Sequence, residues 1–258
     1  MKRRELMGYA GAGIVTALIT TLSSESQTQA QSSNPLSVKW LGHTCFLFSG
    51  GGARVLVNPF RTLGCTAKYR PPKVASDMVL ISSQLLDEGA VEGLPGNPKL
   101  IYEPGTYQYK GLDIQGTAIA HDRKGGKQFG MNTAWSWKQA GVNIVHLGVP
   151  AAPLAFEQTV VFSRLGRPDI VFIPVGGGNK GYNPQEAKQA VEAIKPKLVI
   201  PTHYRTQAAD NRCDISSVDE FLNLMQGIKV QRSNSDTISI NPRNLPDTTT
   251  IQVMSYKF

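Results

Sequence analysis

The sequence has no internal repeat and no long polar tract that would divide it into several parts. Its uncharged N-terminal stretch, Met7 to Leu22, is shorter than the roughly 20 residues that a membrane-spanning helix needs. The 27 lysines and arginines are scattered, and no aromatic residues alternate with them to stack on bases. We therefore expect no nucleic-acid partner and no transmembrane domain in the mature chain, whereas the net charge of +8 is compatible with an anionic substrate or membrane surface.

The N-terminus has the pattern of a signal peptide. Arg3 and Arg4 form a basic head, the mildly apolar stretch follows, and the residues after it are rich in Ser, Gln and Thr. The paired arginines resemble a twin-arginine export signal, with a small-residue cleavage site at Thr28 to Ala30. The pattern predicts a signal over residues 1–30 and export to the periplasm or another extracytoplasmic compartment such as a thylakoid lumen. An uncleaved membrane anchor is the alternative.

Residues 31–258 are expected to form one domain, because the chain is 41% hydrophobic and long enough for a substantial core. Short β-type runs separated by glycine-rich turns dominate the first half. The second half alternates helices and strands, and Asn183-Pro184-Gln185-Glu186 has the cap residue, first-turn proline and glutamate of a helix start. This order favours an α/β (α+β) fold in which helices lie outside β-sheets.

Histidine is scarce where a metal-binding loop is expected. The strand-like run Met78 to Ile81 leads into "SSQLLDEGAV", which contains no histidine. Seven segments nevertheless follow one another at characteristic spacing: "WLGHTCFLF", "VLVNPF", "VLISSQLLDEGA", "AIAHD", "NIVHLGVP", "PDIVFIPVGGGN" and "PKLVIPTHY". In this order they resemble the metallo-β-lactamase superfamily, in its branch of small metal-dependent hydrolases related to ascorbate-6-phosphate lactonase. The resemblance implies a four-layer αββα sandwich.

The four histidines of the chain stand where this branch usually has histidine. The resemblance implies that His121 and His203 are metal ligands, while His43 and His146 flank the site. A neutral imidazole binds borderline metals at physiological pH. A satisfied structural role is the alternative for each of these residues.

Several other ligand positions of the family are altered. Its His-x-His-x-Asp-His loop is here Ser83 to Glu88, in which Asp87 alone is retained and Glu88 stands in place of the last histidine. Val149 replaces an aspartate that bridges two metals, and Asn58 replaces a supporting aspartate.

Sorting the remaining residues by metal position predicts at most one ion. The first position retains only His121, because Ser83 is a poor zinc ligand and Leu85 and Val149 cannot bind a metal. The second retains Asp87 and His203, which would be the catalytic residues, with Glu88 as a third ligand for Zn, Mn or Fe. The cofactor is therefore either none or a single divalent metal.

The segment "GGGNKGYN", Gly176 to Asn183, lies between a predicted strand and a capped helix. It could present backbone N–H groups to an anion. A tight connecting turn is the alternative.

The three cysteines are expected to differ. Cys45 lies in an apolar strand, where burial as a free thiol is common. Cys65 and Cys213 lie in polar loops that follow strands ending at the same edge, and an exported protein meets oxidising conditions. These two residues are therefore a candidate disulfide, with two free surface thiols as the alternative.

Two functions of different classes remain. The altered ligand positions favour an exported relative that no longer performs two-metal hydrolysis and binds an unknown small molecule or protein partner. The alternative is a single-metal hydrolase of an ester, a lactone or a phosphoester. Whether the chain is an enzyme is left open, because a fold alone does not establish an activity.

Overall fold

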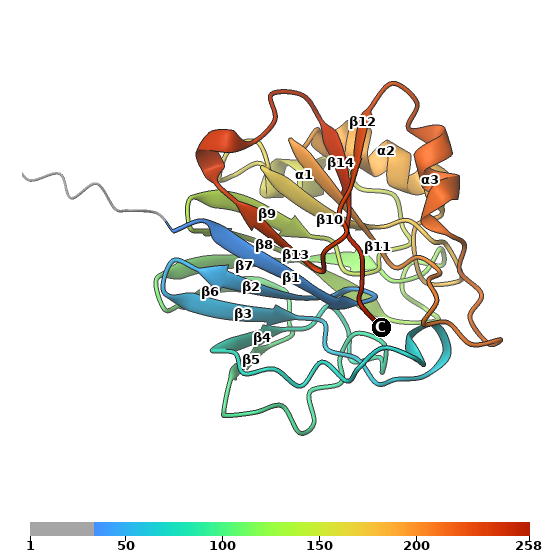
Figure 1. The fold of residues 1–258 in the computed structure, drawn as a ribbon, viewed down its shortest axis with the longest axis horizontal. Coiled ribbons are helices and arrows are strands. Elements are labelled where there is room, and N and C mark those ends of the chain that lie inside the picture. The colour runs from blue at the N-terminus through green and yellow to red at the C-terminus, as the bar shows by residue number, and fades with distance from the viewer. Residues whose placement is uncertain (1–33) are drawn as a thin grey trace, which may run out of the picture. The chain divides into compact units, whose positions relative to one another are not determined.

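The computed structural model describes residues 34–258, which contain two β-sheets and three α-helices (Figure 1). The predicted signal peptide, residues 1–30, lies outside the described residues. The helices are α1 (Phe156–Phe162), α2 (Pro184–Ile194) and α3 (Val218–Leu224), and two short 3-10 helices cover Gly64–Thr66 and Pro242–Asn244. None of the helices within residues 34–258 has the length and apolar character needed to cross a membrane.

The first half of the chain supplies nearly all of a six-stranded sheet, whose order is β13-β1-β2-β3-β4-β5. Its strands are β1 (Leu36–Gly42), β2 (Cys45–Gly50), β3 (Ala53–Val57), β4 (Met78–Leu80), β5 (Lys99–Ile101) and β13 (Thr237–Ile240). β1, β2 and β3 pair as antiparallel neighbours, whereas β3, β4 and β5 run parallel. Alternate residues of β1, Leu36, Val38 and Trp40, are buried, as expected for a strand with one face on the core.

An eight-stranded sheet has the order β12-β14-β11-β10-β9-β8-β7-β6. Its strands are β6 (Gly105–Tyr109), β7 (Leu112–Ala120), β8 (Met131–Gln139), β9 (Val142–His146), β10 (Ile170–Pro174), β11 (Leu198–Thr202), β12 (Lys229–Arg232) and β14 (Thr250–Val253). β6, β7, β8 and β9 pair as antiparallel neighbours. The next strands in the sheet, β10, β11, β14 and β12, pair parallel to one another, and β10 pairs parallel to β9. All residues of β10 and β11 are buried, which is typical of parallel strands covered on both faces.

The helices lie beside the parallel part of the eight-stranded sheet, at the upper right of Figure 1. α2 begins as the sequence predicts, because the Asn183 side chain accepts a hydrogen bond from Glu186 N and the Glu186 carboxylate accepts one from Asn183 N, both at 2.8 Å. Its buried residues, Ala187, Ala190, Val191 and Ile194, form the predicted apolar face. Within residues 34–258 every α-helix follows Ala155, so the six-stranded sheet has no α-helix in its own half of the chain.

One hydrophobic core fills the space between the sheets. Phe46 and Phe48 of the six-stranded sheet meet Phe172 and Trp137 of the other sheet, edge to face, with ring centroids 4.6 and 5.0 Å apart for Phe46–Phe172 and Phe48–Trp137. This packing fixes the two sheets against each other. The loops that leave both sheets at one end are therefore held together, and these loops carry the polar residues described next.

Candidate metal centre

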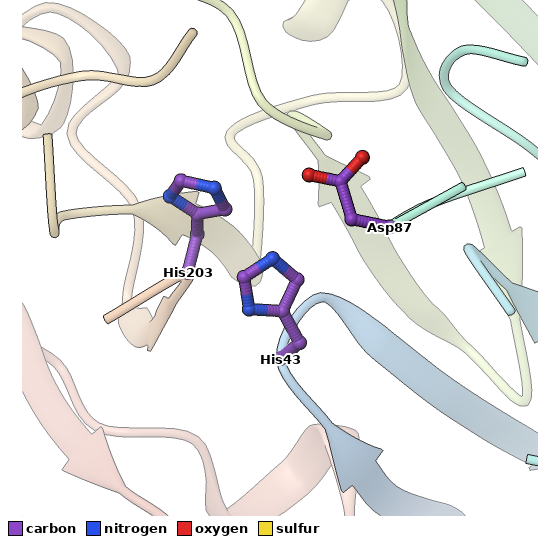
Figure 2. Close-up of side chains that lie close together, drawn as sticks. All are labelled: His43, Asp87 and His203. Atoms are coloured by element: carbon purple, nitrogen blue, oxygen red, sulfur yellow. The ribbon is translucent and has the colours of Figure 1, made fainter. Parts of the chain in front are cut away.

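Three side chains capable of binding a metal converge at that end of the sandwich. His43 lies in the turn between β1 and β2, Asp87 in the loop after β4, and His203 directly after β11. One ligand atom from each lies within 4.8 Å of the other two, and Figure 2 shows the three side chains directed toward a common space. The imidazole rings of His43 and His203 have centroids 4.5 Å apart.

The backbone at this site adopts a conformation that is rare for residues with a side chain. His43, Asn58 and His203 have φ values of 54°, 51° and 48°. Neighbouring groups hold the two histidines in place: Trp40 Nε1 donates to His43 O at 3.1 Å, and Gly176 N donates to His203 O at 2.9 Å. Such left-handed residues cost free energy and cluster at functional sites.

The protonation states of the three candidate ligands suit metal binding. Burial lowers the pKa of His43 to about 4 and the pKa of His203 well below its usual value, so both imidazoles are neutral near pH 7. Burial by itself would raise the pKa of Asp87, but the charge and the hydrogen bond of the Lys180 ammonium outweigh it, and the pKa falls to about 2. Two neutral imidazoles and one carboxylate are a suitable ligand set for a divalent transition metal.

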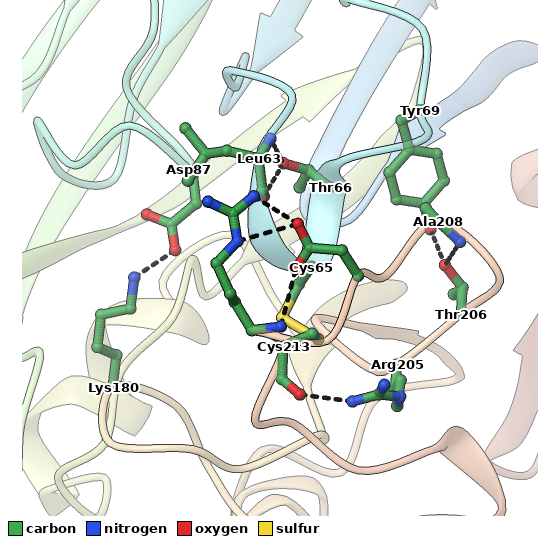
Figure 3. Close-up of a disulfide and its surroundings, with 12 residues drawn as sticks. Leu63, Cys65, Thr66, Tyr69, Asp87, Lys180, Arg205, Thr206, Ala208 and Cys213 are labelled. Atoms are coloured by element: carbon green, nitrogen blue, oxygen red, sulfur yellow. Dashed lines mark hydrogen bonds and ion pairs between the residues drawn. A yellow bond between two sulfur atoms is a disulfide. The ribbon is translucent and has the colours of Figure 1, made fainter.

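Asp87 already has a cationic partner inside the protein. Lys180 Nζ forms an ion pair with Asp87 Oδ2, and a quarter of each side chain is exposed (Figure 3). Lys180 belongs to the loop between β10 and α2, which is 93 positions away in the sequence.

Glu88 is directed away from Asp87 and into the protein. Its Oε1 lies 2.6 Å from His121 Nε2 and accepts a hydrogen bond from Ser83 Oγ at 2.7 Å. Asn58 Nδ2 donates to its other oxygen at 3.4 Å. Glu88 and His121 are almost fully buried. Burial acts to lower the pKa of His121, but the Glu88 carboxylate more than offsets this and raises the pKa overall. We call Asn58, Ser83, Glu88 and His121 the inner cluster.

The remaining predicted site residues have structural roles in the described part of the chain. His146 is fully buried between the sheets, where its Nε2 lies 3.0 Å from Thr44 O and its Nδ1 accepts from Gly148 N at 3.2 Å. Val149 is buried too, and its N–H donates to Asn132 Oδ1 at 2.8 Å.

The glycine segment between β10 and α2 fits the alternative of a tight turn. A Cβ atom at position 176 would lie 2.3 Å from His203 O, so only glycine allows these two loops to approach. Gly177 and Gly178 have φ values of +78° and +75°. The segment thus brings the chain past His203 before it reaches Lys180.

A pocket of about 420 Å³ opens over the three converging side chains. His43, Asp87, Lys180 and His203 line it, which places the candidate ligands on the wall of a cavity large enough for a small molecule.

Cys65, at the rim of this pocket, forms a disulfide with Cys213, and their Cα atoms are 4.6 Å apart (Figure 3). This is the pair that the sequence suggests, and Cys45 is buried as a free thiol. The disulfide joins the 3-10 helix after β3 to the loop that follows His203.

The candidate ligands that converge in the structure differ from the predicted set. Asp87 and His203 come together as expected, but the third member of the group is His43, and Glu88 lies in the inner cluster with His121. A cluster of three metal-binding side chains at His43, Asp87 and His203 is the one found within residues 34–258. No local sequence pattern indicates a role for Lys180, which lies within the segment Gly176 to Asn183.

The donor set fits a single transition metal. A catalytic zinc site normally has three protein ligands and leaves a further position for water or substrate. His43, Asp87 and His203 provide three, and His203 Nδ1 is buried without a hydrogen-bond partner among residues 34–258. A buried ring nitrogen of this kind is costly unless a further group satisfies it.

Comparison with known proteins places this geometry in context. The family described as "Beta-lactamase superfamily domain" matches residues 37–203. A UPF0173 metal-dependent hydrolase of Thermoplasma acidophilum is 28% identical over 198 residues, which cover 66% of this chain and 84% of the relative. A UPF0173 metal-dependent hydrolase of Thermococcus kodakarensis is 29% identical over 196 residues, with 66% and 85% covered.

Solved structures agree with the fold. A proposed Zn-dependent hydrolase of the metallo-β-lactamase superfamily from Thermotoga maritima aligns with a TM-score of 0.67 at 26% identity, over 85% of this chain and 98% of that one. A metallo hydrolase from Ignicoccus hospitalis aligns with a TM-score of 0.56 at 16% identity, over 80% and 98% of the two chains. The predicted α/β fold class of the metallo-β-lactamase type is confirmed, with two sheets and few helices.

Proposed function

Because the chain belongs to the metallo-β-lactamase superfamily, we propose that it is a hydrolase that uses one divalent metal ion bound by His43, Asp87 and His203. The convergence of three ligand atoms within 4.8 Å of one another, on the wall of a pocket, is the observation that carries this proposal. The relatives that are called metal-dependent hydrolases support it.

The inner cluster argues for one ion and against two. His121, the residue that the resemblance assigns to the first metal position, is engaged by the Glu88 carboxylate at 2.6 Å. Val149 and Leu85 offer no ligand atom at the other positions of that site. The Glu88 carboxylate therefore takes up the ring nitrogen of His121 that a second ion would need as a ligand.

When bound, the ion would act as a Lewis acid on a substrate oxygen and increase the acidity of water. His43 and His203, which are neutral near pH 7, would hold it through ring nitrogens, and Asp87 would supply the negative charge. The pocket walls would orient an ester, a lactone or a phosphoester and limit the access of bulk water.

Metal analysis of the purified, disulfide-bonded protein, kept free of chelators, tests this proposal. We expect about one equivalent of Zn, Mn or Fe per chain and hydrolysis of at least one chromogenic ester, lactone or phosphoester that stops after dialysis against a chelator. A chain that takes up no transition metal from a solution of Zn or Mn would contradict the proposal.

A second function, the binding of a small molecule or a protein partner without catalysis, is supported by the Lys180–Asp87 ion pair. This pair neutralises the ligand carboxylate without any ion. In that case the purified protein would contain no metal, and added metal would not raise its melting temperature.

We also propose that the chain is exported to the periplasm or a comparable compartment. The pattern of residues 1–30 and the Cys65–Cys213 disulfide support this, because disulfides persist in oxidising compartments. Mass spectrometry of the protein from its native cells should show an N-terminus near Gln31. Intact Met1 in a soluble cytosolic fraction would contradict export.

A further inference from the structure

The Lys180 ammonium occupies the place of a cation on a candidate metal ligand. Its Nζ pairs with Asp87 Oδ2 (Figure 3). Both residues line the pocket with His43 and His203. An ammonium group is a compact point charge with three donors, so it competes directly with a metal ion for a carboxylate. Asp87 is the sole carboxylate of the candidate ligand group.

The backbone around Lys180 is fixed on both sides. Its own carbonyl lies 3.2 Å from His121 Nδ1, which connects it to the inner cluster. The Arg123 guanidinium donates to Gly178 O at 3.2 Å and to Gly181 O at 3.1 Å. Arg123 is itself anchored by two hydrogen bonds to the Glu186 carboxylate, at 3.0 and 2.7 Å. Lys180 is therefore directed at Asp87 by a loop that is held at three carbonyl groups.

The loop that carries Arg123 is in turn built around one carboxylate. Asp122, which directly follows His121, accepts hydrogen bonds from four backbone N–H groups between 2.7 and 3.0 Å. Burial alone would raise the pKa of Asp122, but these four donors lower it to about 2. Asp122 thus orders the loop that carries Arg123, and Arg123 in turn holds the loop that carries Lys180.

We infer that Lys180 is an internal competitor of the metal ion, so that binding of metal at His43, Asp87 and His203 requires the ammonium to leave Asp87. The inference rests on the proposed metal site and adds the residue that sets its affinity. Loss of the competing charge should strengthen metal binding, since a charge-assisted hydrogen bond no longer has to be broken.

Calorimetric titration of the metal-free, disulfide-bonded protein with Mn²⁺ tests the inference. Lys180→Met should bind Mn²⁺ about tenfold more tightly than the unchanged chain. Lys180→Gln should show the same increase in affinity and replaces Lys180→Met if that variant folds poorly. Lys180→Arg keeps the charge and should bind like the unchanged chain. Lys188→Met is the matched control, because it removes the same charge from the surface of α2, where Lys188 pairs with Glu192 at 3.9 Å.

The four outcomes are distinct. Tighter binding by Lys180→Met or Lys180→Gln, but not by Lys180→Arg or Lys188→Met, supports both the metal site and the competition. Equal binding by all variants supports the metal site and overturns the competition. Binding by Lys180→Met but not by the unchanged chain overturns the proposed function and supports the competition, because the lysine then excludes the ion. No binding by any folded variant overturns both.

Discussion

His43→Ala is expected to lower the affinity of the chain for a divalent metal by more than about 100-fold. Loss of a group that only supports a ligand typically costs 10- to 100-fold in affinity or activity, so loss of one of three ligands should cost more. Asp87→Ala and His203→Ala should have effects of the same size. Hydrolytic activity should fall with metal content. The measurements are calorimetric titration with Mn²⁺ and turnover of a chromogenic substrate at a fixed, limiting metal concentration.

His43→Ala distinguishes the two possible ligand sets. If Glu88 were the third ligand, as the sequence suggested, Glu88→Gln would abolish metal binding and His43→Ala would leave it nearly unchanged. The geometry predicts the opposite result. His146→Gln is the control, because His146 is another buried histidine but lies outside the converging group. Its variant should retain metal, provided that circular dichroism shows native folding.

The fold was largely predictable because its sequence signals are local. Short β-type runs predict most strands of the first half, and the cap at Asn183 and Pro184 predicts α2. The sequence patterns do not predict β6, β12, β13 and β14. β13 pairs with β1, about 200 residues earlier in the chain, and β14 is inserted between β11 and β12. Short strands of this kind are specified by their distant partners rather than by their own pattern.

The site was predictable only in part, for a related reason. The order of the family segments along the chain indicates Asp87 and His203 as ligands. Which residues could bind the same ion depends on the directions of neighbouring side chains, and the sequence does not give these directions. Asp87 and Glu88 are adjacent, and the loop directs one toward the pocket and the other into the inner cluster. Lys180 could not be found from local pattern, because its partner lies in a different loop 93 positions away.

The inner cluster should contribute strongly to stability, and Glu88→Ala is expected to lower the free energy of unfolding by about 3 to 5 kcal/mol. Removing one partner of a buried ion pair leaves an uncompensated group in a low-dielectric interior. Here the change removes the acceptor for Ser83 Oγ and the carboxylate beside His121. Urea denaturation of the metal-free protein measures the effect. Glu192→Ala, which removes an exposed glutamate from α2, should change the same quantity by less than about 0.5 kcal/mol.

The pH dependence of the unfolding free energy tests whether the Glu88–His121 ion pair is the source of this stabilisation. The folded-state pKa of His121 is raised above its ordinary value, so its contribution to stability is fully present below about pH 6.5 and is lost as the pH rises through the raised value. The difference in unfolding free energy between the unchanged chain and Glu88→Gln should therefore be largest below about pH 6.5 and should shrink as the pH rises through the raised pKa of His121. Glu88→Gln should still bind one equivalent of metal. A difference that does not vary with pH would show that Glu88 stabilises the loop by packing and neutral hydrogen bonds, without a charged partner at His121.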